Sequence, residues 1–348
     1  MIKPLLVTIL FVTYTLPIRI CRYGFLSPTT LYDKPDYCNP PTAAMPQKVG
    51  KASIISLLNF KCYLNNKDFD KVARNIQQIV VPSNIKLLIS PPNIYLHKFT
   101  KSLADSNKYE LCAQNLSTIQ GFGAFTGEVT AEMLKDVGVN WCLVGHPEFD
   151  LTRDKQGHSE YTENAQKMIN ALEASITPIL ILSGSESTLR NHSNIIEKSL
   201  STLENPRNCT RTDPSDVEIH YESTNCNGYE NFNVESEVNT LIEKIDKYFA
   251  MLREYYPSKE LHINVAYEPR KSIGSGIPMN PEIVQHIIQR LHFWCANISP
   301  HNVAISVLYG GSLSVKTAKE YVSAGCAGLL FGKCSVTADI QTLIDSLN

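Results

Sequence analysis

The chain has 348 residues, of which 43% are hydrophobic and 19% charged, values typical of a folded protein and not of a fibrous, disordered or polytopic membrane protein. Lys and Arg number 32 and Asp and Glu 34, so the net charge of -2 offers no overall field that would attract nucleic acid or an anionic membrane. The length fits two average domains, or one α/β barrel of about 250 residues with additional segments.

Residues 1–48 differ in composition from the rest of the chain. One lysine precedes the apolar run LLVTILFVTYTLPI, which is too short to span a bilayer and is typical of a signal-peptide core; a buried N-terminal strand is the alternative. The stretch that follows is rich in Pro, Thr and Tyr and has no apolar period. We therefore predict a signal or targeting leader with a linker over 1–48, and a folded domain over 49–348.

From residue 52 onward, short apolar runs alternate with longer helical patterns. Eight runs are strand candidates: 52–60, 85–90, 109–115, 141–145, 178–183, 261–267, 302–310 and 327–332. Apolar residues at three and four spacing predict helices at 68–78, 131–137, 159–173, 235–255 and 281–296. Continuous apolar strands are typical of a parallel sheet buried on both faces, and eight such units favour a single closed (β/α)8 barrel over an open sheet.

The segment 201–233 interrupts this alternation. It is rich in Asn, Ser, Thr and Asp without a sustained period, and we interpret it as a polar insertion after the fifth strand; a partner-binding module is the alternative. Cys209 and Cys226 lie within it and either form a disulfide in an oxidising compartment or remain free thiols. The ten cysteines include no C-x-x-C pair, so we predict no metal site. No G-x-G-x-x-G or Walker sequence follows the first strand, which disfavours dinucleotide and P-loop proteins.

Chemically active side chains follow several of the apolar runs. The first run ends in Asn59 and Lys61, His146 follows the fourth run and Glu268 the sixth. The ends of barrel strands form the usual site of such folds, where a cation, a histidine and a carboxylate together supply an anchor, an acid and a base. Each residue alone has an ordinary explanation as a cap, a turn or a solvated charge. Their recurrence at successive strand ends indicates a site, and glycine turns beside them provide N–H groups for a phosphate.

At these strand ends, short motifs resemble those of the triosephosphate isomerase family over nearly all of residues 49–348. The matching motifs, in chain order, are Asn59-Phe60-Lys61, Ala113-Gln114-Asn115, Gly123-Ala124-Phe125-Thr126-Gly127-Glu128, Gly145-His146-Pro147-Glu148, Ala266-Tyr267-Glu268-Pro269, Ser272-Ile273-Gly274-Ser275-Gly276 and Tyr309-Gly310-Gly311-Ser312. The resemblance implies one (β/α)8 TIM barrel that interconverts dihydroxyacetone phosphate and glyceraldehyde 3-phosphate through an enediol(ate), without a cofactor.

The resemblance also implies residue roles. It makes Glu268 the base, His146 the electrophile that polarises the carbonyl, Lys61 the cation that stabilises negative charge, and Asn59 an orienting donor. It places the substrate phosphate among the N–H groups of Gly274, Ser312, Gly332 and Lys333. It implies a lid over Pro269 to Met279, including Ile273, Gly274, Ser275 and Gly276, which Tyr309 and Ser312 hold when closed.

Family members are mostly dimers, so the resemblance implies a homodimer. It implies contacts with the partner subunit through Gln114, Thr126, Glu128 and Glu148. The other expected partner is the small triose phosphate substrate, with no nucleic acid and no membrane after removal of the leader. Phe149 replaces an arginine that pairs with the partner subunit in the family, which predicts a weaker dimer.

Several residues depart from the family pattern. Pro147 replaces a serine after His146; because proline suits the first turn of a helix, we expect the local geometry to be kept. Arg270, Lys271 and Ser272 replace a hydrophobic-Trp-Ala hinge, which predicts altered lid packing. Lys333 replaces a phosphate-binding glycine and would clash if its backbone had to be left-handed. Around the floor of the site, Leu58, Leu182 and Ser185 replace Gly, Cys and Glu.

The leader and the divergence together predict delivery through the secretory route to an organelle, a plastid of the apicoplast type; cytoplasmic and secreted locations are the alternatives. Two rival functions remain. One is a catalytically weak or inactive phosphate-binding barrel that binds a partner through the insertion, and survival of Asn59, Lys61, His146 and Glu268 together disfavours it. The other is a different phosphate-binding barrel enzyme, which the A-F-T-G-E motif disfavours.

Overall fold

The computed structural model describes residues 53–102, 108–150, 160–184, 232–337 and 339–347. These all belong to one unit that spans residues 43–348. The predicted leader 1–48 and residues 201–231 of the predicted insertion, with Cys209 and Cys226, lie outside the described residues. Within the described part of the chain, no helix is long and apolar enough to cross a membrane.

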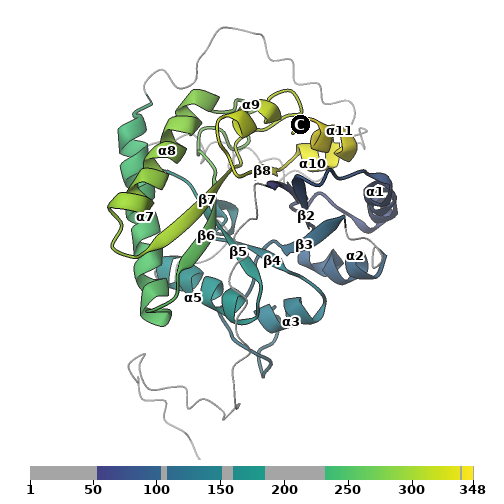
Figure 1. The fold of residues 1–348 in the computed structure, drawn as a ribbon. Coiled ribbons are helices and arrows are strands. Elements are labelled where there is room, and N and C mark those ends of the chain that lie inside the picture. The colour runs from purple at the N-terminus through teal and green to yellow at the C-terminus, as the bar shows by residue number, and fades with distance from the viewer. Residues whose placement is uncertain (1–52, 103–107, 151–159, 185–231, 338, 348) are drawn as a thin grey trace, which may run out of the picture. The chain divides into compact units, whose positions relative to one another are not determined.

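Eight parallel strands close into a barrel in chain order (Figure 1). They are β1 (Ile54–Asn59), β2 (Ile85–Ser90), β3 (Tyr109–Ala113), β4 (Trp141–Val144), β5 (Thr177–Leu182), β6 (Leu261–Tyr267), β7 (Val303–Tyr309) and β8 (Gly328–Phe331). The ring closes because β8 pairs with β1 in parallel, Leu57 opposite Leu330. The predicted (β/α)8 barrel is confirmed, and each predicted strand differs from the observed one by at most two residues at either end.

Helices surround the strands on the outside of the barrel (Figure 1). Those predicted from apolar periodicity are α1 (Asn66–Gln78), α3 (Ala131–Asp136), α5 (Glu160–Glu173), α7 (Val234–Tyr255) and α8 (Pro281–Asn297). Those that periodicity missed are η2 (Asn93–Tyr95), α2 (Leu96–Ser102), α4 (Pro147–Asp150), α9 (Ala318–Ser323), α10 (Cys334–Thr337) and α11 (Ile340–Asp345). The longest of these has 7 residues, which is too short to repeat a helical period clearly.

The end of the predicted insertion belongs to the barrel. Asn233 is the N-cap of α7 and accepts a hydrogen bond from Ser236 N at 2.9 Å. Phe232 is partly buried against the hydrophobic core. The last two residues of the predicted 201–233 segment therefore help to begin a helix.

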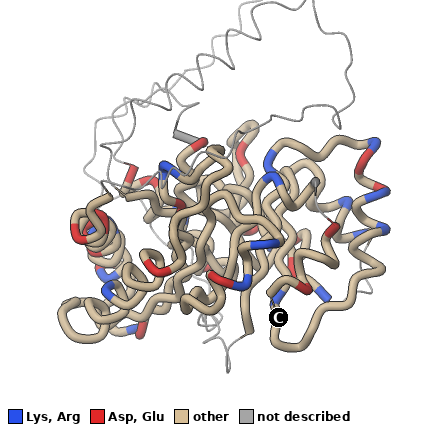
Figure 2. The backbone as a smooth tube through the Cα atoms, turned by 90° about the horizontal axis from the view of Figure 1, so that it is seen from above, with Lys and Arg blue, Asp and Glu red and all other residues tan. Residues whose placement is uncertain are grey.

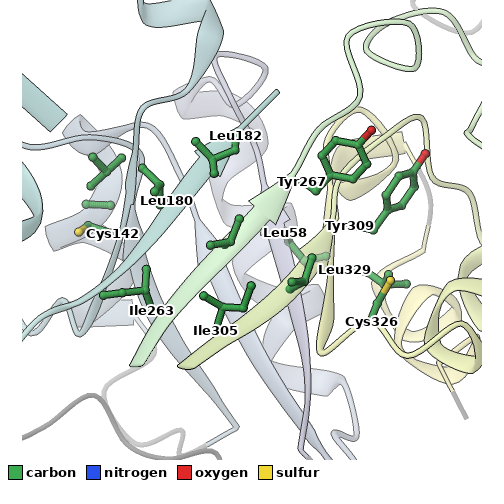
Figure 3. Close-up of a cluster of buried hydrophobic side chains, with 14 of the residues drawn as sticks. Leu58, Cys142, Leu180, Leu182, Ile263, Tyr267, Ile305, Tyr309, Cys326 and Leu329 are labelled. Carbon is green, nitrogen blue, oxygen red and sulfur yellow. The ribbon is translucent and has the colours of Figure 1, made fainter. Parts of the chain in front are cut away.

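Alternate residues of each strand contribute to two separate cores. One set packs outward beneath the helices, and Figure 3 shows part of it, including Leu180, Leu182, Ile263, Tyr267 and Tyr309. The other set fills the barrel interior and includes Leu57 of β1, Cys112 of β3, Ala266 of β6, Leu308 of β7 and Leu330 of β8. Because side chains alternate with a period of two, the residue two positions beyond each interior residue faces the mouth of the barrel.

This alternation determines which strand-end residues meet. The mouth-facing positions include Asn59, Gln114, Glu268, Gly310 and Gly332. Acidic and basic residues are spread along the described backbone, as the nearly balanced composition leads one to expect (Figure 2). The charges that concern function are therefore the few that the strand ends bring into the mouth.

Candidate active site

The turn after β1 directs Lys61 toward the mouth. Asn59 is buried, and its Oδ1 accepts a hydrogen bond from Lys61 N at 2.9 Å, which closes a tight turn. Lys61 has a φ of 43°, in the left-handed region that costs a non-glycine residue about 1 kcal/mol or more. A Cβ placed on Gly332 would lie 3.7 Å from Lys61 Cε, so the lysine side chain passes beside the end of β8. Gly332 is thus a neighbour of Lys61, although the two residues are far apart in sequence.

His146 follows β4, and its two ring nitrogens differ in their hydrogen bonding. Glu148 N donates to His146 Nδ1 at 3.4 Å, and Pro147 occupies the first position of α4, as predicted. A neutral imidazole that accepts at Nδ1 carries its proton at Nε2. His146 Nε2 is buried without a hydrogen-bond partner among the described residues. This nitrogen is therefore placed as a donor for a ligand in the mouth.

Glu268 lies opposite His146 at the end of β6. Its side chain is 3% exposed, and its Oε2 lies 3.7 Å from His146 Nε2. The Glu268 N–H donates to Leu182 O at 2.9 Å, which continues the pairing of β5 with β6 by one residue. A Cβ on Gly310 would lie 2.9 Å from Glu268 Cγ, so the glycine after β7 leaves the room that the carboxylate occupies. The ends of the neighbouring strands β5 and β7 therefore provide a buried position for this acid.

Burial and neighbouring charges shift the ionisation of Glu268. Burial raises its pKa, His146 and Lys61 act to lower it, and Glu148 adds to the increase, so that the net pKa of Glu268 lies above its usual range. The same environment acts on Lys61. Burial lowers the pKa of Lys61, but its hydrogen bond to Glu148 and the charges of Glu148 and Glu268 outweigh burial and raise the pKa of Lys61 overall. A protonated lysine next to a carboxyl group of increased basicity can support proton transfer.

The predicted lid, residues 269–279, is hydrogen-bonded to the loop after β7. Gly276 N donates to Ser312 Oγ at 3.1 Å, and the Ser312 hydroxyl donates to Ser272 O. Met279 N donates to Tyr309 OH at 2.8 Å. The predicted contacts of Tyr309 and Ser312 with this segment are therefore present. Gly274 and Gly276 have φ values of 68° and 74°, which explains glycine at both positions.

The four predicted phosphate-binding residues occupy neighbouring loops. Ser312 and Gly274 belong to the joined loop and lid, whereas Gly332 and Lys333 follow β8 beside Lys61. Lys333 is exposed and is not among the described non-glycine residues with positive φ. The backbone clash considered for Lys333 is therefore absent in this structure.

The residues predicted to contact a second subunit differ in their surroundings. Gln114 Nε2 donates within its own chain, to Lys61 O at 3.0 Å, Ser90 O at 3.1 Å and Asn59 Oδ1 at 3.3 Å. It therefore ties the turn after β1 to β2 and β3. Thr126 and Glu128 are exposed in the loop before α3, and Glu148 is half exposed beside Lys61.

Two features near the mouth are not evident from sequence motifs. Ser183, directly after β5, has a buried hydroxyl without a hydrogen-bond partner among the described residues. Glu237, in the first turn of α7, accepts a hydrogen bond from Tyr267 OH at 2.7 Å. A serine at the end of an apolar run is typical of a turn, and a glutamate in the first turn of a helix is typical of a residue that interacts with the helix dipole. Neither residue therefore indicates a function in the sequence. Within the described ranges, no cluster of three or more His, Cys, Asp or Glu could hold a metal ion.

Comparisons with known proteins agree on one family. A family model described as triosephosphate isomerase matches residues 54–255 and 226–347. The triosephosphate isomerase of Saccharomyces cerevisiae is 26% identical over 293 residues, covering 83% of this chain and 96% of the yeast protein. That of Neurospora crassa is 26% identical over 291 residues, with the same shares covered. That of Blochmanniella floridana is 28% identical over 273 residues, covering 77% of this chain and 84% of the relative.

Proposed function

The chain belongs to the triosephosphate isomerase family, and from this premise we propose that it interconverts dihydroxyacetone phosphate and glyceraldehyde 3-phosphate. One observation carries the proposal. The buried carboxylate of Glu268 lies 3.7 Å from the unpartnered Nε2 of His146, within the same mouth as Lys61. A base, a hydrogen-bond donor and a cation are the groups that proton transfer next to a carbonyl requires.

The reaction begins when Glu268 takes a proton from the carbon next to the substrate carbonyl. The electron pair of the C–H bond forms a C=C bond, and the carbonyl electron pair moves onto oxygen. His146 Nε2–H donates to that oxygen, and the Lys61 ammonium stabilises its negative charge. Return of the proton from Glu268 to the adjacent carbon, with the two oxygens exchanging one proton through His146, yields the isomer. A raised pKa makes Glu268 a stronger base than an exposed carboxylate.

The phosphate group would bind the N–H groups of Gly274, Ser312, Gly332 and Lys333. The exposed Lys333 ammonium adds a positive charge next to this position. Closure of residues 269–279 would exclude water from the enediol(ate) and prevent its decomposition. The hydrogen bonds from this segment to Tyr309 and Ser312 support such a closed arrangement.

An isomerase assay coupled to oxidation or reduction of one product tests the proposal. The full chain and residues 49–348 should both turn over triose phosphate, and Glu268→Gln and His146→Gln should be strongly impaired while remaining folded. Turnover of the unchanged protein no higher than that of these variants would overturn the enzymatic function. Phosphate binding without turnover would instead favour the inactive phosphate-binding barrel.

Self-association is part of the same proposal. Phe122 and Phe125, 72% and 57% exposed, lie in the loop after β3, and Ile94, 83% exposed, lies in the short helix η2 after β2. Large apolar side chains that gather in adjacent βα loops are typical of a protein interface. We propose a homodimer formed through these loops, with Thr126 and Glu128 at the contact.

Delivery to an organelle, such as a plastid, rests on residues 1–48. Fusion of this segment to a fluorescent protein should direct it through the secretory route to an organelle. A fluorescent signal confined to the cytoplasm would contradict this assignment, and a signal in the medium would indicate secretion.

A further inference from the structure

Glu237 is a buried carboxylate outside the proposed catalytic set. It lies in the first turn of α7 and is only 4% exposed. A carboxylate is rarely buried to this extent unless specific partners hold it. Its Oε1 accepts a hydrogen bond from Tyr267 OH at 2.7 Å. Tyr267 directly precedes the proposed base, Glu268, at the end of β6.

The turn after β5 leaves space for this carboxylate. A Cβ on Gly184 would overlap the carboxylate of Glu237, so only glycine permits the approach. Lys244, two turns further along α7, donates from Nζ to Ser183 O at 2.8 Å and to Gly184 O at 3.4 Å. The first half of α7 is therefore joined to the end of β6 through Glu237 and to the turn after β5 through Lys244.

Tyr267 also reaches the C-terminal end of the lid. Its hydroxyl lies 3.8 Å from Met279 Sδ, and Met279 is fully buried. The backbone of Met279 is held from both sides, since its N–H donates to Tyr309 OH and its carbonyl accepts from Tyr321 OH. The rings of Tyr309 and Tyr321 stack at 4.2 Å between centroids. Figure 3 shows Tyr267 and Tyr309 side by side with their hydroxyls pointing the same way.

We propose that Glu237 is a positioning residue for the lid. By accepting from Tyr267 OH, it orients the group of three tyrosines (Tyr267, Tyr309 and Tyr321) that anchors the lid at Met279. The hydrogen bond also holds the residue before Glu268. The catalytic consequence rests on the proposed isomerase function, whereas the effect on the lid does not depend on it.

A loosened anchor has a defined chemical consequence. If the lid opens and water reaches the enediolate, the electron pair of the enediolate expels the phosphate group from the neighbouring carbon. The bond between that carbon and the phosphate oxygen breaks, and proton transfer then gives an α-ketoaldehyde and inorganic phosphate. The reaction needs no oxidant or reductant. Phosphate released per isomerisation is therefore a measure of lid closure that a general loss of stability does not change.

Three variants interrupt the Glu237 contact in different ways. Glu237→Ala removes the acceptor, Tyr267→Phe removes the donor while keeping the ring, and Gly184→Ala displaces the carboxylate. Glu237→Gln keeps an oxygen that can accept from Tyr267 OH and should restore much of the effect. Two changes on α7 serve as matched controls.

The controls show whether loss of any carboxylate or any tyrosine hydroxyl on α7 has the same effect as loss of the contact between Glu237 and Tyr267. Glu235→Gln removes an exposed carboxylate of the same helical turn, which contacts His286 and Arg290. Tyr248→Phe removes a buried hydroxyl that accepts from Asn164 at 3.3 Å, away from the lid contacts. Both controls should behave as the unchanged protein.

Hydrogen exchange over residues 269–279, measured without substrate, provides the first readout. We expect exchange about fivefold faster in Glu237→Ala, Tyr267→Phe and Gly184→Ala, as the loss of one hydrogen bond predicts, and near-native exchange in Glu237→Gln. This result would stand even if the protein had no isomerase activity. In the active protein, the same three variants should release several times more phosphate per turnover.

A purely structural role gives a different outcome. The three variants would then lower the unfolding temperature, while lid exchange and phosphate release per turnover would equal those of the controls, and the inference would be overturned. If Glu237→Ala does not fold, Tyr267→Phe decides, because it preserves the buried volume. Equal lid exchange in Tyr267→Phe and Tyr248→Phe would also refute the inference.

Discussion

The environment of Glu268 sets the pH range in which this residue can act as a base. Burial disfavours the charged carboxylate and raises the pKa of Glu268, while His146 and Lys61 partly oppose that shift. In the proposed reaction, only the ionised form of Glu268 can remove a proton from the substrate. When the pH is lowered, activity should therefore be lost at a higher pH than in an enzyme whose base has the pKa of an exposed glutamate.

Replacement of this carboxylate should separate activity from stability. Glu268→Gln should lower kcat by about 100- to 10,000-fold, the usual contribution of a general base. A carboxyl group whose pKa is raised on folding binds protons more tightly in the folded state. The free energy of unfolding therefore decreases as the pH rises above the pKa that this group has in the unfolded chain. Above that pH, Glu268→Gln should therefore unfold at a temperature no lower than the unchanged protein, as scanning calorimetry across pH would measure. Marked destabilisation at neutral pH would contradict this account.

Gly310 tests how accurately Glu268 must be placed. Since a Cβ there would lie 2.9 Å from Glu268 Cγ, Gly310→Ala should displace the carboxylate from its position beside His146. Displacement of a catalytic group by about 1 Å reduces the rate by up to roughly 100-fold. We expect kcat to fall while the unfolding temperature changes little. A variant with unchanged kcat would show that the carboxylate can shift without loss.

At the scale of elements, α7 joins the two ends of the barrel. Its first turn carries Glu237 at the mouth, and its last turn carries Arg253 at the opposite end. Arg253 Nη1 donates to Tyr256 O at 2.9 Å and to Lys259 O, and Nη2 donates to His301 O and to Asn302 O at 3.1 Å. One guanidinium therefore fastens the turns that precede β6 and β7.

Loss of this guanidinium should affect folding and not substrate binding. Arg253→Ala should lower the free energy of unfolding by about 2 kcal/mol, since charged donors are removed from several carbonyls. KM should remain unchanged, because the mouth lies at the other end of the strands. Urea denaturation gives the measurement, with Arg290→Ala, which removes an exposed pair to Glu235, as the control. Equal destabilisation by both variants would be evidence against a special role for Arg253.

For the whole molecule, the proposed dimer depends on the exposed segments after β2 and β3. We expect the unchanged protein to sediment as a dimer and the double variant Phe122→Asp with Phe125→Asp to sediment as a monomer. Charged side chains at the centre of an apolar contact cannot be desolvated without large cost. Phe293→Asp, at an exposed position on α8, should leave the dimer intact. A monomeric unchanged protein would show that these loops do not form the interface.

The predicted insertion should be dispensable for the barrel. A deletion of 201–231 keeps Phe232 and Asn233, which pack on the core and cap α7. We expect this deletion to retain isomerase turnover and sedimentation behaviour, because the described strands and helices form the barrel without it. Loss of either property would indicate that the insertion takes part in function or assembly.

Sequence alone determined the architecture and most of the candidate site. The strands of a parallel barrel are buried on both faces, so each reads as a continuous apolar run, and this signal is local. The candidate residues Asn59, Lys61, His146 and Glu268 could be found for the same reason, because each lies at or directly after the end of such a run. The helices that were not predicted have at most 7 residues and contain too few turns to show a clear period.

Tertiary structure alone decided the contacts that join distant parts of the chain. The tautomer of His146 follows from a backbone N–H that reaches its Nδ1, and the room for Glu268 follows from Gly310 on a neighbouring strand. The bond between Tyr267 and Glu237 joins residues 30 positions apart on a strand and a helix. No local pattern encodes such pairs, because they depend on which side chains the closed barrel and its helices bring within hydrogen-bonding distance.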